Sequence, residues 1–230
     1  QIKNKIKYPN NIFITGISKN NLPHKVTQAN QSYNLGSWVE KNILKANQLI
    51  LHNIKDTTRS KTYCYVDNPL PKFLSFRAFF SFLNWSIGAS MYSFYRMFFG
   101  EWQYSFFLGE AALAKKVSLT PQNCLCRTYI FTTSNMLLKP LWTEVFEARK
   151  GKVEMLLYST NIEGFKKKNN KKTPYAYFRK MNWKNITGWD EKQRIYLENA
   201  IENKINFSVK GPIWFSDANA RVPDTEKISI

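Results

Sequence analysis

The chain has 230 residues, of which 43% are hydrophobic, so it is long and apolar enough to bury a core and is not a disordered sequence. Its 34 Lys and Arg residues outnumber 16 Asp and Glu residues, which gives a formal net charge of +18 and favours acidic partners such as phosphates, anionic glycans, anionic lipid headgroups or nucleic acid. Frequent Lys, Asn and Ile are also typical of an AT-rich genome, so the charge alone does not choose among these partners.

The cysteines and histidines give no sign of a metal site or a disulfide framework. Cys124 and Cys126 are separated by one residue, which is closer than the usual spacing of zinc-binding cysteines. His24 and His52 have no nearby grouping of Cys, Asp or Glu that resembles ligand spacing. We therefore expect no metal, and a reducing, cytoplasmic setting.

The first portion of the chain, 1–72, carries a strand pattern and a helix pattern. Residues 11–17 are predicted to form a strand. Ser37 and Glu40 have the spacing of a capping box, in which each side chain satisfies a free backbone donor at a helix N-terminus. Apolar residues then recur at helical spacing, which predicts a helix from Ser37 to about residue 50 whose apolar stripe faces the core: Val39, Ile43, Ala46 and Ile50. Pro69 and Pro71 end this portion.

The second portion, 73–120, is unusually aromatic. Between Arg77 and Arg96 there are eighteen uncharged residues, which is close to the length of a membrane-spanning helix. Ser and Asn side chains make this run too polar for a span, so we expect one or two helices that are buried in the domain or lie in a lipid headgroup layer. The two arginines at its ends suit anionic lipid.

The third portion, 121–230, alternates between strand and helix patterns. We expect strands near 127–133, 152–158, 186–189 and 205–209, with helices that begin at Pro140 and at Glu191. Two consecutive strand-helix-strand units imply an α/β fold with a Rossmann-like parallel sheet flanked by helices. The Gly-rich dinucleotide fingerprint is absent from the sequence. We group all three portions in one domain.

Polar residues follow three of these strands, at 132–135, 159–163 and 216–217. In a parallel sheet all three exits would open on one edge, where ligands and catalytic groups collect. The last exit follows the apolar run 205–209, which we expect to be a buried strand, and a turn at 211–212. Asp217 has an alternative role there, which is to cap a local turn with its own side chain. The Lys-rich run 166–172 is typical of a solvated loop and could also form an anion-attracting rim.

Four segments, in a fixed order along the sequence, resemble segments of the bacterial polysaccharide-biosynthesis proteins that are named for a PFTS motif. This group is similar to the retaining β-Kdo glycosyltransferases. The resemblance covers about residues 128–230. The PFTS motif itself does not occur in this sequence, the chain opens without Met, and it closes on a strand-like run. We therefore expect a fragment that is cut at both ends. Its C-terminal end would lie before the nucleotide-binding half of the family's proteins. The segments are Pro140-Leu-Trp-Thr-Glu144, Leu157-Tyr-Ser-Thr-Asn-Ile-Glu-Gly-Phe165, Trp189-Asp-Glu-Lys-Gln193 and Val209-Lys-Gly-Pro-Ile-Trp-Phe-Ser-Asp217.

The resemblance implies the N-terminal half of a GT-B-like glycosyltransferase that uses a CMP-activated sugar acid such as Kdo, with retention of configuration and no further cofactor. It implies Asp217 as the nucleophile and Glu144 as the acid/base partner, with Glu163 as the alternative partner. Glu144 also fits the favourable place of an acid near a helix start, and Glu163 could close a capping box. The matched segments supply the residues expected to contact substrate: Trp142, Ser159, Thr160, Asn161, Glu163 and Ser216.

The implied partners are a nucleotide-sugar donor and a glycan or glycolipid acceptor of surface polysaccharide, such as capsule or lipopolysaccharide. The implied location is cytoplasmic, with peripheral contact to anionic lipid at the inner face of the plasma membrane. The alternative function is a non-catalytic basic module that binds anionic membrane, glycan or nucleic acid. Nucleic acid is disfavoured because single-strand binding combines aromatic and basic residues, whereas this chain separates them.

Overall fold

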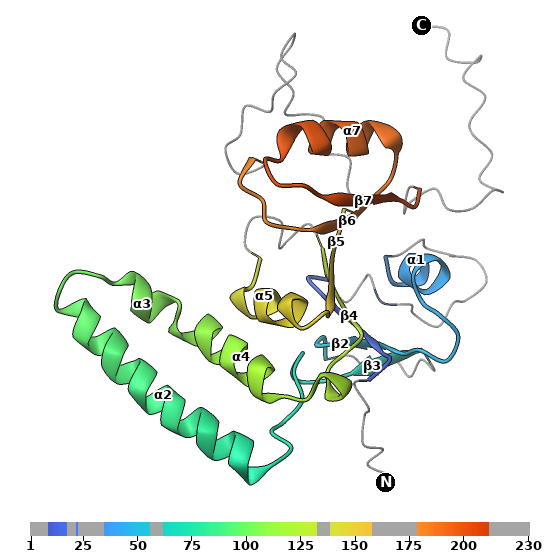
Figure 1. Cartoon of the computed structure of the whole chain (residues 1–230). Coiled ribbons are helices and arrows are strands. Elements are labelled where there is room, and N and C mark those ends of the chain that lie inside the picture. Colours follow the sequence, from blue (N-terminus) through green and yellow to red (C-terminus); the bar gives the residue numbers. More distant parts are fainter. Residues whose placement is uncertain are drawn as a thin grey trace, which may run out of the picture.

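The computed structural model describes residues 9–17, 22, 35–55, 62–132, 139–157 and 179–211. In these residues one sheet carries helices on both faces, and a pair of helices projects to one side of it (Figure 1). The α/β fold with a parallel sheet, predicted from the sequence, is confirmed.

Within the described residues the sheet has seven strands in the order β3-β2-β1-β4-β5-β6-β7, and every neighbouring pair is parallel. The strands expected near 127–133, 152–158 and 205–209 lie close together in this sheet, because only β6 lies between the last two. The strands are β1 Ile12–Thr15, β2 Ile50–His52, β3 Tyr63–Tyr65, β4 Thr128–Thr132, β5 Lys152–Leu156, β6 Asn185–Gly188 and β7 Asn206–Val209.

The core has two layers, one on each face of the sheet. Ile12 and Ile14 of β1 pack in the layer that contains α1, whereas Phe13 packs in the layer that contains α5, because successive strand residues point to opposite faces. Figure 1 shows α1 and α5 on opposite sides of the sheet. Both faces of the central strands are therefore covered, which explains why β1 and β4 are apolar runs without strict alternation. The helices beside the sheet are α1 Leu35–Asn42, α4 Leu108–Leu119, α5 Leu141–Ala148 and α7 Glu191–Ala200.

The direction in which successive strands are added to the sheet reverses between β1 and β4. The chain adds β2 and β3 on one side of β1 and then adds β5 to β7 on the far side of β4. The Thr132 hydroxyl at the end of β4 donates to the Gly16 carbonyl just after β1, at 2.8 Å. Such a reversal leaves a crevice at the carboxyl ends of the strands, where ligands bind in open α/β sheets. The segments that leave β4, β5 and β7 at this edge, 133–138, 158–178 and 212–230, lie outside the described residues.

The helix predicted from Ser37 to about residue 50 is wrong at both ends. α1 begins before Ser37, which lies inside the helix instead of at the N-terminal cap that the sequence predicted. The helix ends at Asn42, and Ile50 begins β2 instead of continuing the apolar stripe. The Asn11 side chain accepts a hydrogen bond from the Leu49 backbone N–H at 2.9 Å, and this contact sets the start of β2 beside β1. Strand pairing, which periodicity along the sequence cannot reveal, decides the structure here.

The prediction that 205–209 forms a buried strand is also wrong in part. β7 exists, but within the part of the chain that the structure describes it pairs only with β6, at the edge of the sheet. Val209 is consequently 43% exposed. One side chain of β7, Phe207, packs closely over Gly188 of β6: a Cβ atom at Gly188 would lie 2.3 Å from the Phe207 ring. This contact requires glycine at the end of β6.

The aromatic portion is helical, as predicted. The Ser75 side chain accepts a hydrogen bond from the Ala78 backbone N–H at 3.2 Å and so caps the first helix. We call α2 and α3 the helical arm; most of its aromatic rings are exposed to solvent rather than buried in the domain. Among the helices described, none combines the length and the hydropathy that crossing a bilayer requires. The arm consists of α2 Phe76–Met97 and α3 Gln103–Phe106, and α4 follows it directly.

We predict that Phe146→Ala lowers the free energy of unfolding by about 3–5 kcal/mol. The Phe146 ring is fully buried and meets the Tyr129 ring edge-on at a centroid distance of 5.0 Å, so the substitution leaves a cavity between α5 and β4. The measurement is urea unfolding followed by circular dichroism. Phe76→Ala is the matched control, because the Phe76 side chain is 83% exposed and its loss should leave stability nearly unchanged. Equal effects of the two changes would contradict the described core.

Candidate active site

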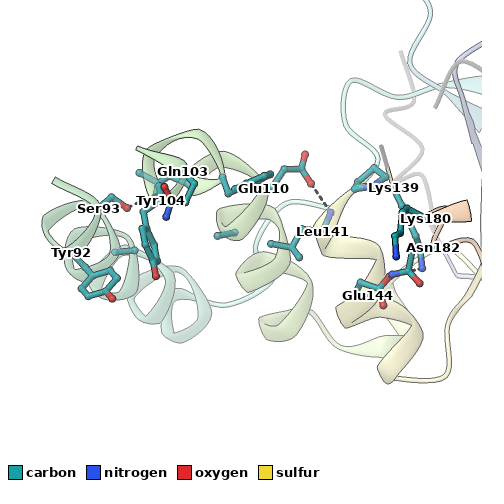
Figure 2. A pocket seen from close by; sticks show the side chains of 15 residues that line it. Tyr92, Ser93, Gln103, Tyr104, Glu110, Lys139, Leu141, Glu144, Lys180 and Asn182 are labelled. Atoms are coloured by element: carbon teal, nitrogen blue, oxygen red, sulfur yellow. Dashed lines mark hydrogen bonds and ion pairs between the residues drawn. The ribbon is translucent and has the colours of Figure 1, made fainter. Parts of the chain in front are cut away.

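A groove of about 930 Å³ lies between the helical arm and the start of α5. Figure 2 shows its two ends: Tyr92, Ser93, Gln103 and Tyr104 of the arm stand at one end, and Lys139, Glu144, Lys180 and Asn182 stand at the other. The wall between the two ends is mostly apolar, with Phe107, Leu108, Pro140 and Leu141, and it also carries Glu110. The groove therefore has a charged end beside α5 and an aromatic end on the arm.

A buried lysine organises the charged end. The Lys139 side chain is 5% exposed, and its ammonium pairs with Glu144 at 2.7 Å and with Glu147 at 2.6 Å. The same ammonium lies 5.9 Å from the centre of the Trp183 ring. Because burying a cation is costly without partners, the two carboxylates compensate the burial of the Lys139 side chain beneath the groove.

Glu144 is the carboxylate of this cluster that reaches the groove. Its side chain is 37% exposed, whereas that of Glu147 is 6% exposed and does not line the groove. Besides Lys139, the side-chain amide of Asn182 donates to the Glu144 carboxylate at 3.0 Å. Two donors thus orient an acidic group that substrate can reach.

The position of α5 depends on contacts with α4 at both of its ends. The Glu110 carboxylate of α4 accepts a hydrogen bond from the Leu141 backbone N–H at 2.9 Å, where Pro140 supplies no side-chain cap. At the other end Arg149 donates to the carbonyls of Val117 and Thr120, the latter at 2.8 Å, and so satisfies the last turn of α4. The two helices therefore lie side by side in the same direction, and the first turn of α5 is fixed at the groove.

Lys180 adds a second cation at the groove. Its side chain is 74% exposed and pairs with Glu202 at 2.8 Å. Hydrogen bonds from Lys180 and from Arg179 lower the pKa of the Glu202 carboxyl. Exposed lysine at this place can attract an anionic ligand.

The cysteine nearest to the core is not a nucleophile at neutral pH. Burial raises the pKa of the Cys126 thiol to about 12, because the thiolate would lose its hydration. All three cysteines in the chain are free thiols, and no group of His, Cys, Asp and Glu among the described residues has the arrangement of a metal site.

A comparison with known protein families matches residues 85–230 to the family described as polysaccharide biosynthesis PFTS motif protein. The chain belongs to this family. No curated protein and no protein of solved structure matches it. The family match includes the start of α5 with Glu144, and it extends through the C-terminal segment that carries Asp217. Membership in the PFTS-motif family indicates a role in polysaccharide biosynthesis.

The family assignment and the geometry divide the residues predicted from the sequence into three groups. Glu144 lines the groove. Trp142 lies in the core, 4% exposed, and its ring packs edge-on against Tyr129 at 4.9 Å, so the structure does not place it in the groove. The other candidates lie outside the described residues, and their roles stay predictions: Ser159, Thr160, Asn161, Glu163, Ser216 and Asp217.

Three residues of the charged end were missed by sequence reasoning. Lys139 directly precedes Pro140 and carried a weak signal, since a cation beside the matched segment is a candidate partner for Glu144. Asn182 and Lys180 carried no signal, because they are far from the matched segment in the sequence. Asn182, for example, is 38 residues from Glu144 along the chain.

We predict that Lys139→Met lowers the free energy of unfolding by about 3–5 kcal/mol, because it leaves the Glu147 carboxylate buried without its nearest partner. The remaining cation, Lys184, is 3.4 Å from Glu147 and largely exposed. Thermal and urea unfolding measure the change. The control is Lys180→Met, which removes an exposed lysine from an exposed ion pair and should alter stability very little. A Lys139→Met protein as stable as the control would show that the cluster is not buried as described.

Proposed function

We propose that this protein transfers a sugar in bacterial surface polysaccharide biosynthesis, with retention of configuration, from a CMP-activated sugar acid such as Kdo. The observation that carries the proposal is the Glu144 carboxylate, which Lys139 and Asn182 orient in a groove, in a chain of the PFTS-motif family. A groove of about 930 Å³ has room for a drug-sized ligand and hence for a sugar unit of an acceptor.

The proposed reaction has two displacements. A carboxylate, for which we propose Asp217, attacks the anomeric carbon; the bond from that carbon to the phosphate oxygen breaks, and CMP leaves. An acceptor hydroxyl then attacks the same carbon from the other side, the bond to the carboxylate breaks, and the hydroxyl proton passes to a base. Two inversions give retention.

Glu144 is the proposed base of the second displacement. Its carboxylate is held by the Lys139 ammonium and is reachable from the groove, which places a proton-accepting oxygen where an acceptor hydroxyl could bind. Asn182 adds direction, because its amide occupies one carboxylate oxygen and leaves the other oxygen for substrate. By family resemblance, Ser159, Thr160, Asn161, Glu163 and Ser216 are proposed to hold the substrates, with Glu163 as the alternative base.

The charge of the site suits the proposed donor. CMP and a sugar acid both carry negative charge, and two lysines stand at the charged end of the groove, Lys139 beneath it and Lys180 at its surface. Cations placed beside a transferred anionic group also stabilise the charge that develops on the departing phosphate.

The test is sugar transfer by the full-length protein with Glu144→Gln, measured as release of CMP and as labelled acceptor. We expect kcat to fall by about 10²–10⁴-fold, because the amide keeps the shape but cannot accept the proton. Glu147→Gln is the matched control: it alters the same lysine cluster, but its side chain does not line the groove. Its kcat per folded molecule should stay near that of the unchanged protein.

Equal losses in the two variants would mean that Glu144 acts only through the ion pair, and unchanged kcat in Glu144→Gln would exclude it as the base. Asp217→Asn addresses the nucleophile separately. That variant should lose transfer and retain its affinity for CMP, since an amide has the same shape as the carboxylate and loses only its nucleophilic oxygen. Transfer at the normal rate by Asp217→Asn would end the proposal of a covalent intermediate on this residue.

A further inference from the structure

The helical arm carries a continuous stripe of exposed apolar side chains along α2. Its members recur every three or four residues, so they share one face of the helix. Their exposed fractions range from 42% at Leu83 to 83% at Phe76. We call this face the aromatic stripe; its residues are Phe76, Phe80, Leu83, Ile87, Met91, Phe94 and Phe98.

The stripe continues onto the tip of the arm. Phe99, Trp102 and Phe106 are exposed there by 64%, 56% and 82%. The Phe98 ring meets the Phe94 ring edge-on at 5.0 Å, so the stripe and the tip form one apolar surface. In Figure 1 the arm extends away from the sheet. The exposed fractions show that no other described element covers this surface. A contiguous exposed patch of this kind marks an interaction site, whereas single exposed rings do not.

The fold of the arm does not need the stripe. α2 packs against α3 and α4 through a different face. Ser93 on that face is buried, and its hydroxyl donates to the Tyr104 carbonyl of α3 at 3.3 Å. The Phe82 ring, on the same side, packs against Phe73 at 5.0 Å. Because these contacts already fix α2, the seven side chains of the stripe are available to an external partner.

The charges around the stripe favour an anionic partner. From residue 68 to residue 106, the end of the tip, the sequence contains three cations, Lys72, Arg77 and Arg96, and one acidic residue, Glu101. Arg96 is paired with Glu101, whereas Arg77 is exposed at the start of α2. The chain as a whole carries a formal net charge of +18. Anionic lipid headgroups attract such a surface at physiological ionic strength.

The residues that flank the stripe favour a bilayer over a partner helix. Helices that pair along an apolar seam use charged flanking residues to select the partner and its register. Here the flanks are uncharged and small or polar, as at Ser81, Asn84 and Gly88. A lipid surface needs no register, and aromatic rings with Tyr and Trp at their margin are the side chains that settle at the headgroup level.

We propose that the helical arm docks in the plane of a membrane that contains anionic lipids, with the aromatic stripe and the tip inserted among the headgroups. The expected depth is that of an amphipathic helix in the interface, about 5–10 Å. Tyr92, Ser93 and Tyr104, on the side of the arm away from the stripe, line the groove. Docking therefore holds the aromatic end of the groove beside the bilayer.

The experiment is cosedimentation of the intact protein with vesicles of phosphatidylcholine alone and of phosphatidylcholine and phosphatidylglycerol in equal parts. We expect binding to the mixed vesicles to exceed binding to the neutral vesicles by roughly tenfold or more and to weaken as salt is added. The double variant Phe80→Gln/Phe94→Gln should lose at least about tenfold in binding, because it removes two rings that are 61% and 62% exposed. Circular dichroism verifies that the variant keeps its helices.

Ile195→Gln is the matched control, since Ile195 is an exposed apolar residue of α7, 49% exposed and outside the arm. Its binding should equal that of the unchanged protein. Phe98→Gln, a single change at a residue that is 74% exposed, gives an independent variant should the double variant misfold. Arg77→Gln should reduce the preference for mixed over neutral vesicles while leaving the helices intact.

Three results would overturn the proposal. The first is absence of binding to the mixed vesicles, and the second is undiminished binding by the stripe variants. The third is a dimer in analytical ultracentrifugation that the stripe variants dissociate, without vesicle binding, which would assign the stripe to contact between two copies of the chain. None of these readouts depends on sugar transfer, so the result is separate from the test of Glu144.

Discussion

The pairing of α4 with α5 is the contact on which the rest of the described site depends. Glu110 holds the first backbone donor of α5, and Arg149 holds the last carbonyls of α4, so neither helix can slide along the other without breaking a hydrogen bond at one end. α5 is at the same time anchored to the sheet by Phe146, which is fully buried against Tyr129. The sheet therefore fixes the position of α5, and α5 fixes the position of α4. α4 in turn fixes the helical arm, which directly precedes it in the sequence. The groove is the space that this chain of contacts leaves open.

This arrangement links the groove to the edge of the sheet where ligands are expected. A helix that follows a parallel strand starts near the carboxyl end of that strand, so the first turn of α5, with Glu144, lies toward the edge where β4 ends. The carboxyl ends of β1 and β4, between which the strand order reverses, lie at the same edge. α2 serves two purposes in this scheme: one face closes the groove, and the opposite face carries the aromatic stripe. An acceptor that enters from a membrane would meet the aromatic end of the groove before the charged end.

The sequence predicted the regular half of the fold and little of the site. Strands β4 to β7 were found because each is a short apolar run between turn residues, and the parallel sheet followed from their alternation with helices. β2 and β3 were missed because each is three residues long, too short for a periodic signal, and depends on hydrogen bonds to distant strands. Glu144 was found by resemblance to a family, whereas Lys139 and Asn182 reach it only through tertiary folding. The exposure of the aromatic rings was not predictable either, because apolar spacing along a helix is the same for a buried face and an unpartnered one.

The most direct test of the account is a crystal structure of the full-length protein with CMP and an acceptor oligosaccharide bound. Our account predicts the acceptor in the groove between the helical arm and α5, with one of its hydroxyls about 3 Å from the Glu144 carboxylate and pointing toward the donor site. An acceptor bound on the other face of the sheet, beside α1, with the groove unoccupied, would contradict it.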